Sequence, residues 1–208
     1  MKLSLFTFAT SVIGAAVFTT NVYALDIGSP MPKLTEKLQN LNGKESTLDS
    51  FAGKKGTLVI FSCNHCPYVK KWAKRMTTIG NRVMSEGFGV VVINSNDAEK
   101  YPDDNLAAMN EFAKEHGQKF AYVADRTSNF ARTFGATRTP EVFLFDSKGK
   151  LAYTGAIDDN PEVGDVKVRH LDVALAAVAK NEKVPLPTTK SVGCSIKFRD
   201  NKASANRK

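Results

Sequence analysis

The stretch of sequence that decides the fold runs from residue 57 to residue 67 and reads Thr-Leu-Val-Ile-Phe-Ser-Cys-Asn-His-Cys-Pro. Its first five residues are almost entirely apolar and rich in β-branched side chains, which is typical of a strand buried on both faces. Farther along, apolar residues recur at spacings of three and four, which predicts an amphipathic helix. These residues are Val69, Trp72, Met76, Ile79 and Val83. Cys63 and Cys66 therefore lie where a buried strand meets a helix.

A Cys-x-x-Cys pair at such a junction predicts dithiol–disulfide chemistry. Free backbone N–H groups at a helix N-terminus stabilise a thiolate, the reactive form of cysteine. We expect Cys63, nearer the open end, to form mixed disulfides, and Cys66, one turn deeper, to resolve them. Asn64 and His65 are expected to tune the thiolate, with His65 making the disulfide more oxidising.

Two other interpretations of the pair remain open. The first is a structural disulfide without catalytic function. The second is a zinc- or copper-binding module that uses Cys63, His65 and Cys66. A closed zinc site usually has four ligands in two separated pairs, and the sequence contains no second Cys-x-x-Cys or histidine pair, so we expect no metal.

Strands and helices alternate along the rest of the chain. Strands are predicted at 34–41, 45–48, 57–61, 90–93, 120–124, 142–145 and 151–154, and helices from about 67, from a cap at Asp103 or Asp104, at 128–134 and at 168–179. Asn42-Gly43 marks a hairpin between the first two strands. This order predicts an α/β fold with a mixed central β-sheet, helices on both faces and an added N-terminal β-hairpin.

The composition is that of a globular protein: 42% of the 208 residues are hydrophobic and 24% are charged, which excludes disordered and fibrous classes. The net charge of +8 comes without a nucleic-acid-binding motif, so nucleic acid is not an expected partner. We predict a single domain at 25–184, followed by an irregular basic tail at 185–208 that contains Cys194.

The first 24 residues have the features of a secretory signal peptide. Lys2 precedes an apolar run, and Val22-Tyr23-Ala24 suits a signal peptidase, which predicts cleavage after Ala24. The run is shorter than the ~20 residues that a spanning helix needs, so we expect no stable membrane insertion after cleavage. The protein is then expected to be periplasmic or secreted, where a disulfide can persist.

The sequence resembles the thioredoxin superfamily, and more closely its peroxiredoxin-like (redoxin) branch, whose members carry Cys-Asn-His-Cys-Pro-Tyr-Val, here 63–69. The resemblance extends over nearly all of the chain after residue 24 and includes the segments 139–146, 154–159 and 193–197. It implies a thioredoxin-like fold, no cofactor, protein or small-molecule thiols and disulfides as substrates, and a redox partner protein. It also implies a cis Pro140 that faces the cysteine pair and leaves the backbone of Thr139 free to pair with an extended substrate.

The sequence departs from the family patterns in ways that bear on function. Typical peroxiredoxins have a threonine where this chain has Cys63 and an arginine where it has Pro140, and these two residues polarise the peroxide. Because both are missing here, a thiol peroxidase or antioxidant protein is the second functional hypothesis, after a thiol–disulfide oxidoreductase. Thioredoxins bury a carboxylate in the strand before the pair, where it helps to deprotonate the resolving thiol. Residues 57–62 contain no acid, so that step needs another base or is slow. Cys194 is open to three interpretations: an auxiliary resolving thiol, an intermolecular link or an inert residue.

Overall fold

The computed structural model of the protein describes residues 24–200. The expected signal peptide, except for Ala24, lies outside the described residues. Within 24–200, none of the helices has the length and apolar character needed to cross a membrane.

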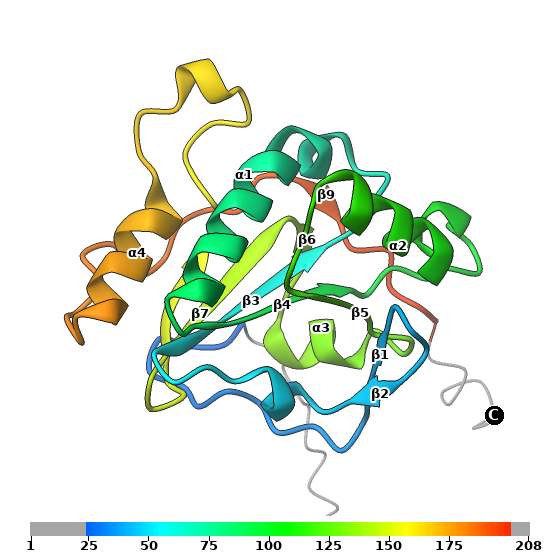
Figure 1. The fold of residues 1–208 in the computed structure, drawn as a ribbon, viewed down its shortest axis with the longest axis horizontal. Helices are drawn as coiled ribbons and strands as arrows, with labels where there is room; N and C mark the ends of the chain where they lie inside the picture. Colours follow the sequence, from blue (N-terminus) through cyan, green and yellow to red (C-terminus); the bar gives the residue numbers. More distant parts are fainter. Residues whose placement is uncertain (1–23, 201–208) are drawn as a thin grey trace, which may run out of the picture.

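A seven-stranded mixed sheet forms the centre of the molecule (Figure 1), with the strand order β2-β1-β5-β4-β3-β7-β8. The strands are β1 Leu38–Asn40, β2 Glu45–Ser46, β3 Gly56–Ser62, β4 Gly89–Asn94, β5 Ala121–Ala124, β7 Glu141–Asp146 and β8 Leu151–Gly155. Strands β3, β4 and β5 are parallel, and β7, β8 and the β1–β2 hairpin add antiparallel pairs. The predicted mixed sheet and N-terminal hairpin are confirmed.

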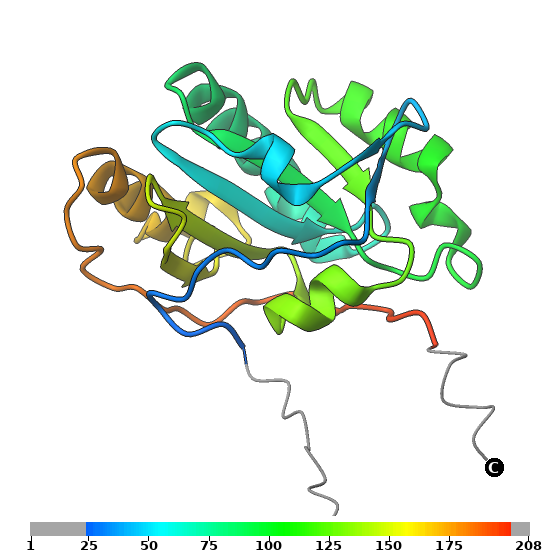
Figure 2. The ribbon, with the colours of Figure 1, turned by 90° about the horizontal axis from the view of Figure 1, so that it is seen from below.

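Helices cover both faces of the sheet (Figure 2). They are α1 Pro67–Ser85, α2 Leu106–Glu115, α3 Asn129–Phe134 and α4 His170–Ala179, with short 3₁₀ turns at Leu48–Phe51, Pro102–Asp104 and Val163–Asp165. Along β3, Leu58 and Ile60 pack with residues of α1, α2 and α4, whereas Val59 and Phe61 pack with α3. Alternate residues of a strand point to opposite faces, so burial on both sides explains the unbroken apolar run.

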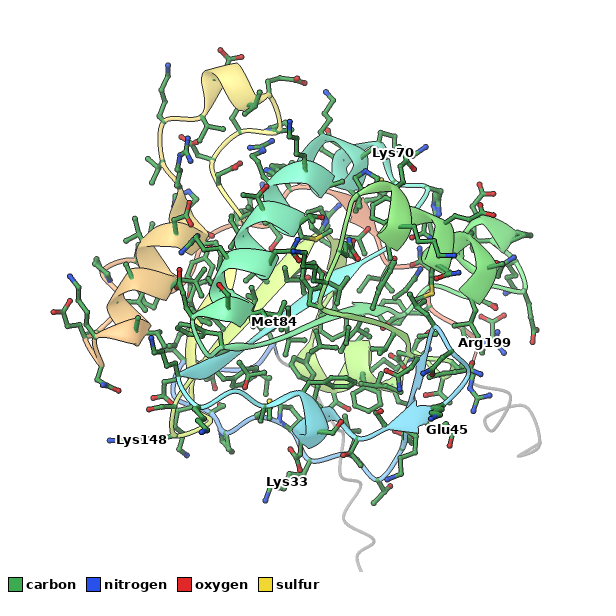
Figure 3. The ribbon with its side chains drawn as sticks, in the orientation of Figure 1. Lys33, Glu45, Lys70, Met84, Lys148 and Arg199 are labelled. Atoms are coloured by element: carbon green, nitrogen blue, oxygen red, sulfur yellow. The ribbon has the colours of Figure 1, made fainter. Side chains whose placement is uncertain are left out.

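Helix α1 follows directly from β3, as the spacing of its apolar residues predicts. Exposed Lys70 near its beginning and Met84 near its end mark the course of the helix in Figure 3. Its buried side includes Trp72 and Met76, which lie in the core against the sheet. The helix thus fixes the turn that carries the two cysteines.

The expected cap of α2 is wrong. Asn105 caps the helix, and its Oδ1 accepts a hydrogen bond from the Ala108 N–H at 2.9 Å. Asp103 and Asp104 instead lie in the preceding 3₁₀ turn, and Asp104 is buried. Since its carboxylate does not cap the helix, it is available to the cysteine turn.

The C-terminal segment is mostly irregular, but it is bonded to the rest of the fold. Strand β9, Cys194–Ser195, pairs with β6, Arg138–Thr139, in a second sheet of two strands (Figure 1). Ile196 continues the attachment, because its N–H donates to the carbonyl of Thr137 at 3.0 Å. This pairing was not predicted from the sequence, and it brings Cys194 to the start of β7.

Candidate active site

The cysteine pair occupies the connection between β3 and α1. Cys63 follows the last residue of β3, and Cys66 is the N-cap of α1, with Pro67 in the first turn, where no N–H is needed. Cys63 is 1% exposed and Cys66 is 0% exposed. Both thiols are therefore buried in this structure.

The segment before β7 lies against both sulfurs. The Thr139–Pro140 bond is cis, as the resemblance implied. The Cys63 Sγ is 3.2 Å from the Thr139 Oγ1, and the Cys66 Sγ is 3.4 Å from the Thr139 carbonyl oxygen. Residues separated by more than seventy positions in the sequence thus form one cluster.

The backbone of Thr139 is not free, which corrects the expectation from the resemblance. Thr139 is paired with Cys194, and Arg138 with Ser195, in the antiparallel contact of β6 with β9. In this register the Cys194 Sγ lies 2.7 Å from the Cys66 Sγ. The approach of the two segments is close at Gly193, where a Cβ atom would lie 2.1 Å from the Thr139 carbonyl oxygen. Only glycine fits there without a shift of the backbone.

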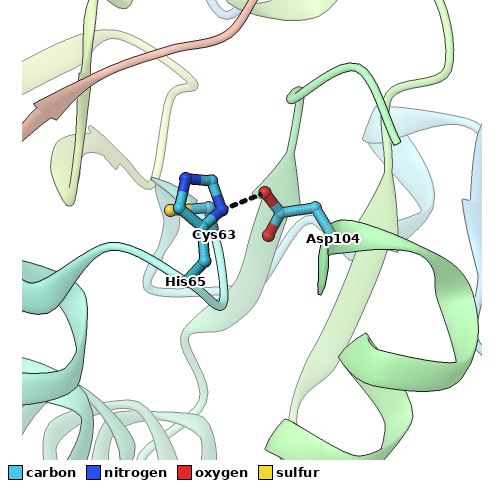
Figure 4. A group of neighbouring side chains, drawn as sticks. All are labelled: Cys63, His65 and Asp104. Carbon is cyan, nitrogen blue, oxygen red and sulfur yellow. Dashed lines mark hydrogen bonds and ion pairs between the residues drawn. The ribbon is translucent and has the colours of Figure 1, made fainter. Parts of the chain in front are cut away.

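A buried carboxylate, that of Asp104, bonds to the cysteine turn (Figure 4). The Asp104 Oδ2 is 2.7 Å from the His65 Nδ1, and the Asp104 Oδ1 accepts the Asn64 backbone N–H at 2.7 Å. The amides of Asn94 and Asn96 donate to the same carboxylate, at 3.1 and 2.8 Å. Four partners therefore hold Asp104 in place, and through it they hold the two residues between the cysteines.

Asn64 is held by its side chain as well. Its Nδ2 donates to the Asp103 carbonyl oxygen at 2.8 Å, and its Oδ1 accepts a hydrogen bond from the Tyr122 hydroxyl at 2.8 Å. Burial raises the pKa of Tyr122 well above its ordinary value, so its hydroxyl stays protonated and donates. Asp104 and Tyr122 were not predicted as site residues from the sequence. The absence of an acid from 57–62 indicated only a missing base, and it pointed to neither residue.

The thiolate of the reduced pair is favoured on Cys66. The hydrogen bond shared with Cys66 raises the pKa of Cys63, and burial and the negative charge of Asp104 raise it further. The hydrogen bond from Cys63 lowers the pKa of Cys66 to about 4 against the effect of burial, and Cys194 adds a further hydrogen bond. From the sequence, the negative charge was expected on Cys63. The difference follows from the hydrogen bond between the two thiols, which raises the pKa of Cys63 and lowers that of Cys66.

Metal binding was an open interpretation, and the structure groups a different set of donors from the expected one. Within 24–200, the donor atoms of Cys63, His65 and Asp104 lie within 4.8 Å of one another, and Cys66 is not part of this group. Thiolate, imidazole and carboxylate are all zinc ligands. Both Asp104 oxygens already accept protein hydrogen bonds, however, and Cys63 is protonated and buried. The arrangement therefore fits a hydrogen-bonded thiol site better than a metal centre.

Comparison with known proteins gives the same family. The family model described as Redoxin matches residues 26–175. The thiol:disulfide interchange protein DsbE of Escherichia coli K12 is 27% identical over 153 residues, which cover 73% of this chain and 77% of that protein. The thiol–disulfide oxidoreductase ResA of Bacillus thuringiensis is 24% identical over 127 residues, covering 61% of this chain and 68% of that protein.

A solved structure of a hypothetical protein from Sinorhizobium meliloti is also similar. It aligns with a TM-score of 0.79 and 31% sequence identity, covering 86% of this chain and 98% of that one. The Redoxin match spans most of the chain, and the sheet, the cysteine turn and the cis-proline segment agree with it. The chain therefore belongs to the Redoxin family and has a thioredoxin-like fold.

Proposed function

We propose that this protein is an exported thiol–disulfide oxidoreductase that works by dithiol–disulfide exchange through Cys63 and Cys66. One observation carries the proposal: both sulfurs lie against Thr139, beside the cis Pro140. The similarity to DsbE and ResA supports an oxidoreductase of the thioredoxin-like class. The substrates are protein or small-molecule thiols and disulfides, and a redox partner protein restores the pair.

The chemistry begins with the proton that the two thiols share. Cys66 as thiolate accepts the Cys63 proton while the Cys63 sulfur attacks a substrate disulfide, and one substrate thiolate leaves. That leaving thiolate takes the proton from Cys66, which then attacks the Cys63 sulfur and releases the second substrate thiolate. The products are the Cys63–Cys66 disulfide, one thiol and one thiolate. The leaving substrate thiolate thereby supplies the base for Cys66 that residues 57–62 lack.

His65 and Asn64 position the turn and tune the couple. Asp104 bonds to both of these residues, and Tyr122 bonds to Asn64. A hydrogen-bond donor or a positive charge near the sulfurs stabilises the reduced form, so His65→Ala is expected to make the disulfide less oxidising. The potential of the Cys63–Cys66 couple relative to that of its partner sets the direction of electron flow.

Reduction of insulin by the purified protein, with dithiothreitol as the electron source, tests the proposal. Cys63→Ser and Cys66→Ser are each expected to lower turnover by at least about 100-fold, because Cys63 forms the mixed disulfide and Cys66 resolves it. Thr78→Ser, on the exposed side of α1, is the matched control and should retain the activity. Unchanged turnover in both cysteine variants would refute the proposal.

The same protein preparation separates this function from the other hypotheses. A peroxidase would consume hydrogen peroxide stoichiometrically with added thiol, and a metal-binding module would retain zinc or copper after purification under reducing conditions. We expect insulin reduction with neither. Export is supported by the sequence of residues 1–24, and N-terminal sequencing of the secreted or periplasmic protein is expected to begin at Leu25.

A further inference from the structure

The third cysteine lies in contact with the pair. The Cys194 Sγ is 2.7 Å from the Cys66 Sγ, and a disulfide needs about 2.05 Å, so a displacement of about 0.7 Å separates contact from a bond. We propose that Cys194 is a third redox cysteine, whose thiolate attacks the Cys66 sulfur of the Cys63–Cys66 disulfide and forms a Cys66–Cys194 disulfide. This inference deepens the proposed function and rests on it.

The backbone around Cys194 is built to hold the sulfur at that place. Cys194 is directly opposite Thr139 in the β6–β9 register, and Thr139 also contacts both sulfurs of the pair. Gly193 permits the close approach, because any Cβ atom there would meet the Thr139 carbonyl. The Arg138 Nη1 donates to the Gly193 carbonyl oxygen at 3.1 Å. The strand contact thus aims Cys194 at Cys66.

The residues that follow β9 attach the segment to a second part of the fold. The Asp97 N–H donates to the Lys197 carbonyl oxygen at 2.7 Å, and the Lys197 N–H donates to the Asn96 Oδ1 at 2.8 Å. Ile196 is 5% exposed and packs in the core on the α3 side of the sheet. Since the segment is held on both sides of Cys194, the sulfur–sulfur contact is a property of the fold and not of a free tail.

The proposed step balances without an external oxidant. The Cys194 thiolate forms a bond to the Cys66 sulfur, the Cys63–Cys66 bond breaks, and Cys63 leaves as a thiolate. One disulfide and one thiolate exist before and after, so the oxidising equivalent moves within three sulfurs of one chain. Cys63 is thereby returned to its reduced form, as a thiolate, while the protein remains oxidised.

Oxidation of the pair removes an influence that raises the pKa of Cys194, and a lower pKa favours the attacking thiolate. In the reduced protein, burial raises the pKa of Cys194 to about 11, and the hydrogen bond and negative charge of Cys66 contribute to this increase. When Cys66 is in a disulfide, it has no negative charge and no longer accepts a hydrogen bond from the Cys194 thiol. The positive charges of Lys197 and Arg138, which lower the pKa of Cys194, then act without that opposition.

Peptide mapping of the oxidised full-length protein tests the step directly. Trypsin places Cys63 and Cys66 in the peptide 56–70 and Cys194 in the peptide 191–197, so the proposed bond links two peptides. Reduced protein is oxidised with one equivalent of diamide, quenched in acid, alkylated with N-ethylmaleimide and digested. We expect the linked peptides, with one alkylated thiol at Cys63, in at least about one tenth of the oxidised molecules, since two disulfides within about 30 mV differ no more than tenfold in population.

Two variants make the outcome decisive. In Cys63→Ser, the 56–70 and 191–197 peptides should be linked in most oxidised molecules. In Cys194→Ser/Ser195→Cys, the thiol moves to the exposed neighbouring residue on the opposite side of β9, and the link should be at least about tenfold less abundant. Linked peptides absent from both the wild-type protein and Cys63→Ser would overturn the inference. The insulin assay is independent of this result, so failure of the third cysteine and failure of the proposed function are distinguishable.

Discussion

Asp104→Asn tests how the buried carboxylate supports the cysteine turn. Asp104 is 3% exposed and accepts hydrogen bonds from two directions. Its Oδ1 accepts the Asn64 N–H and the Asn94 amide, at 2.7 and 3.1 Å. Its Oδ2 accepts the Asn96 amide at 2.8 Å and lies 2.7 Å from the His65 Nδ1. Asparagine keeps one of these oxygens and places an NH₂ group where the other was.

The cost follows from the donors that lose their acceptor. In the least costly orientation the new NH₂ group replaces Oδ2, where the His65 Nδ1 can accept from it in the neutral ring. The Asn96 amide is then left without its acceptor inside the protein. A buried donor without a partner costs about 1–3 kcal/mol, so we expect Asp104→Asn to lower the free energy of unfolding by about 2 kcal/mol. The opposite orientation leaves two donors unpaired and costs more.

Urea unfolding of the reduced protein measures this loss, and Asp103→Asn provides the matched control. Asp103 is exposed, and its substitution removes the same charge one residue away, so its effect should stay within about 0.5 kcal/mol. Removal of the Asp104 charge should also lower the pKa of Cys63, which the pH dependence of its alkylation reports. Equal unfolding free energies for the two variants would refute the role assigned to the Asp104 carboxylate.

Three further predictions address other parts of the site. Gly193→Ala places a Cβ atom 2.1 Å from a backbone oxygen, so trypsin should cleave the segment after Lys190 faster than in the wild type, while Gly164→Ala, which meets nothing within 4 Å, should not change the rate. Tyr122→Phe removes the hydroxyl donor to Asn64 and should lower the unfolding free energy by about 1 kcal/mol in urea. Because the pKa of Cys66 in the folded protein is lowered from 9.0 to about 4, the stability of the reduced protein should increase as the pH rises from about 4 to 9. The urea midpoint of Cys66→Ser should increase less over the same pH range, and an identical pH dependence of the two proteins would contradict the lowered pKa.

The central part of the fold was predictable because its signals are local. The apolar run before Cys63 reflects a strand that is buried on both faces. The helical spacing of apolar residues from Val69 to Val83 reflects a helix that is buried on one face, and both patterns can be recognised in the sequence. The cap of α2 was misassigned because three consecutive polar residues, Asp103 to Asn105, are all suitable caps. Only the 3₁₀ turn distinguishes them.

The remaining features depend on contacts between distant segments. The pairing of Thr139 with Cys194 joins two strands of two residues each, too short for a periodic pattern to be recognised. Asp104 reaches the cysteine turn from a loop some forty residues away. The need for glycine at position 193 could not be predicted, because it arises from the close approach of the Thr139 carbonyl in the folded protein.

The pairing of β9 with β6 has a consequence for substrate selection. Proteins that bind an extended peptide at a strand edge use its backbone hydrogen bonds, and here the chain's own C-terminal segment already makes them. That segment acts as a tethered competitor at high effective concentration, so a polypeptide that needs the Thr139 edge binds only the fraction of molecules in which the competitor has left. If that fraction is about one in a hundred, the apparent affinity for such a polypeptide falls about 100-fold, and ligands that bind without this edge escape the penalty.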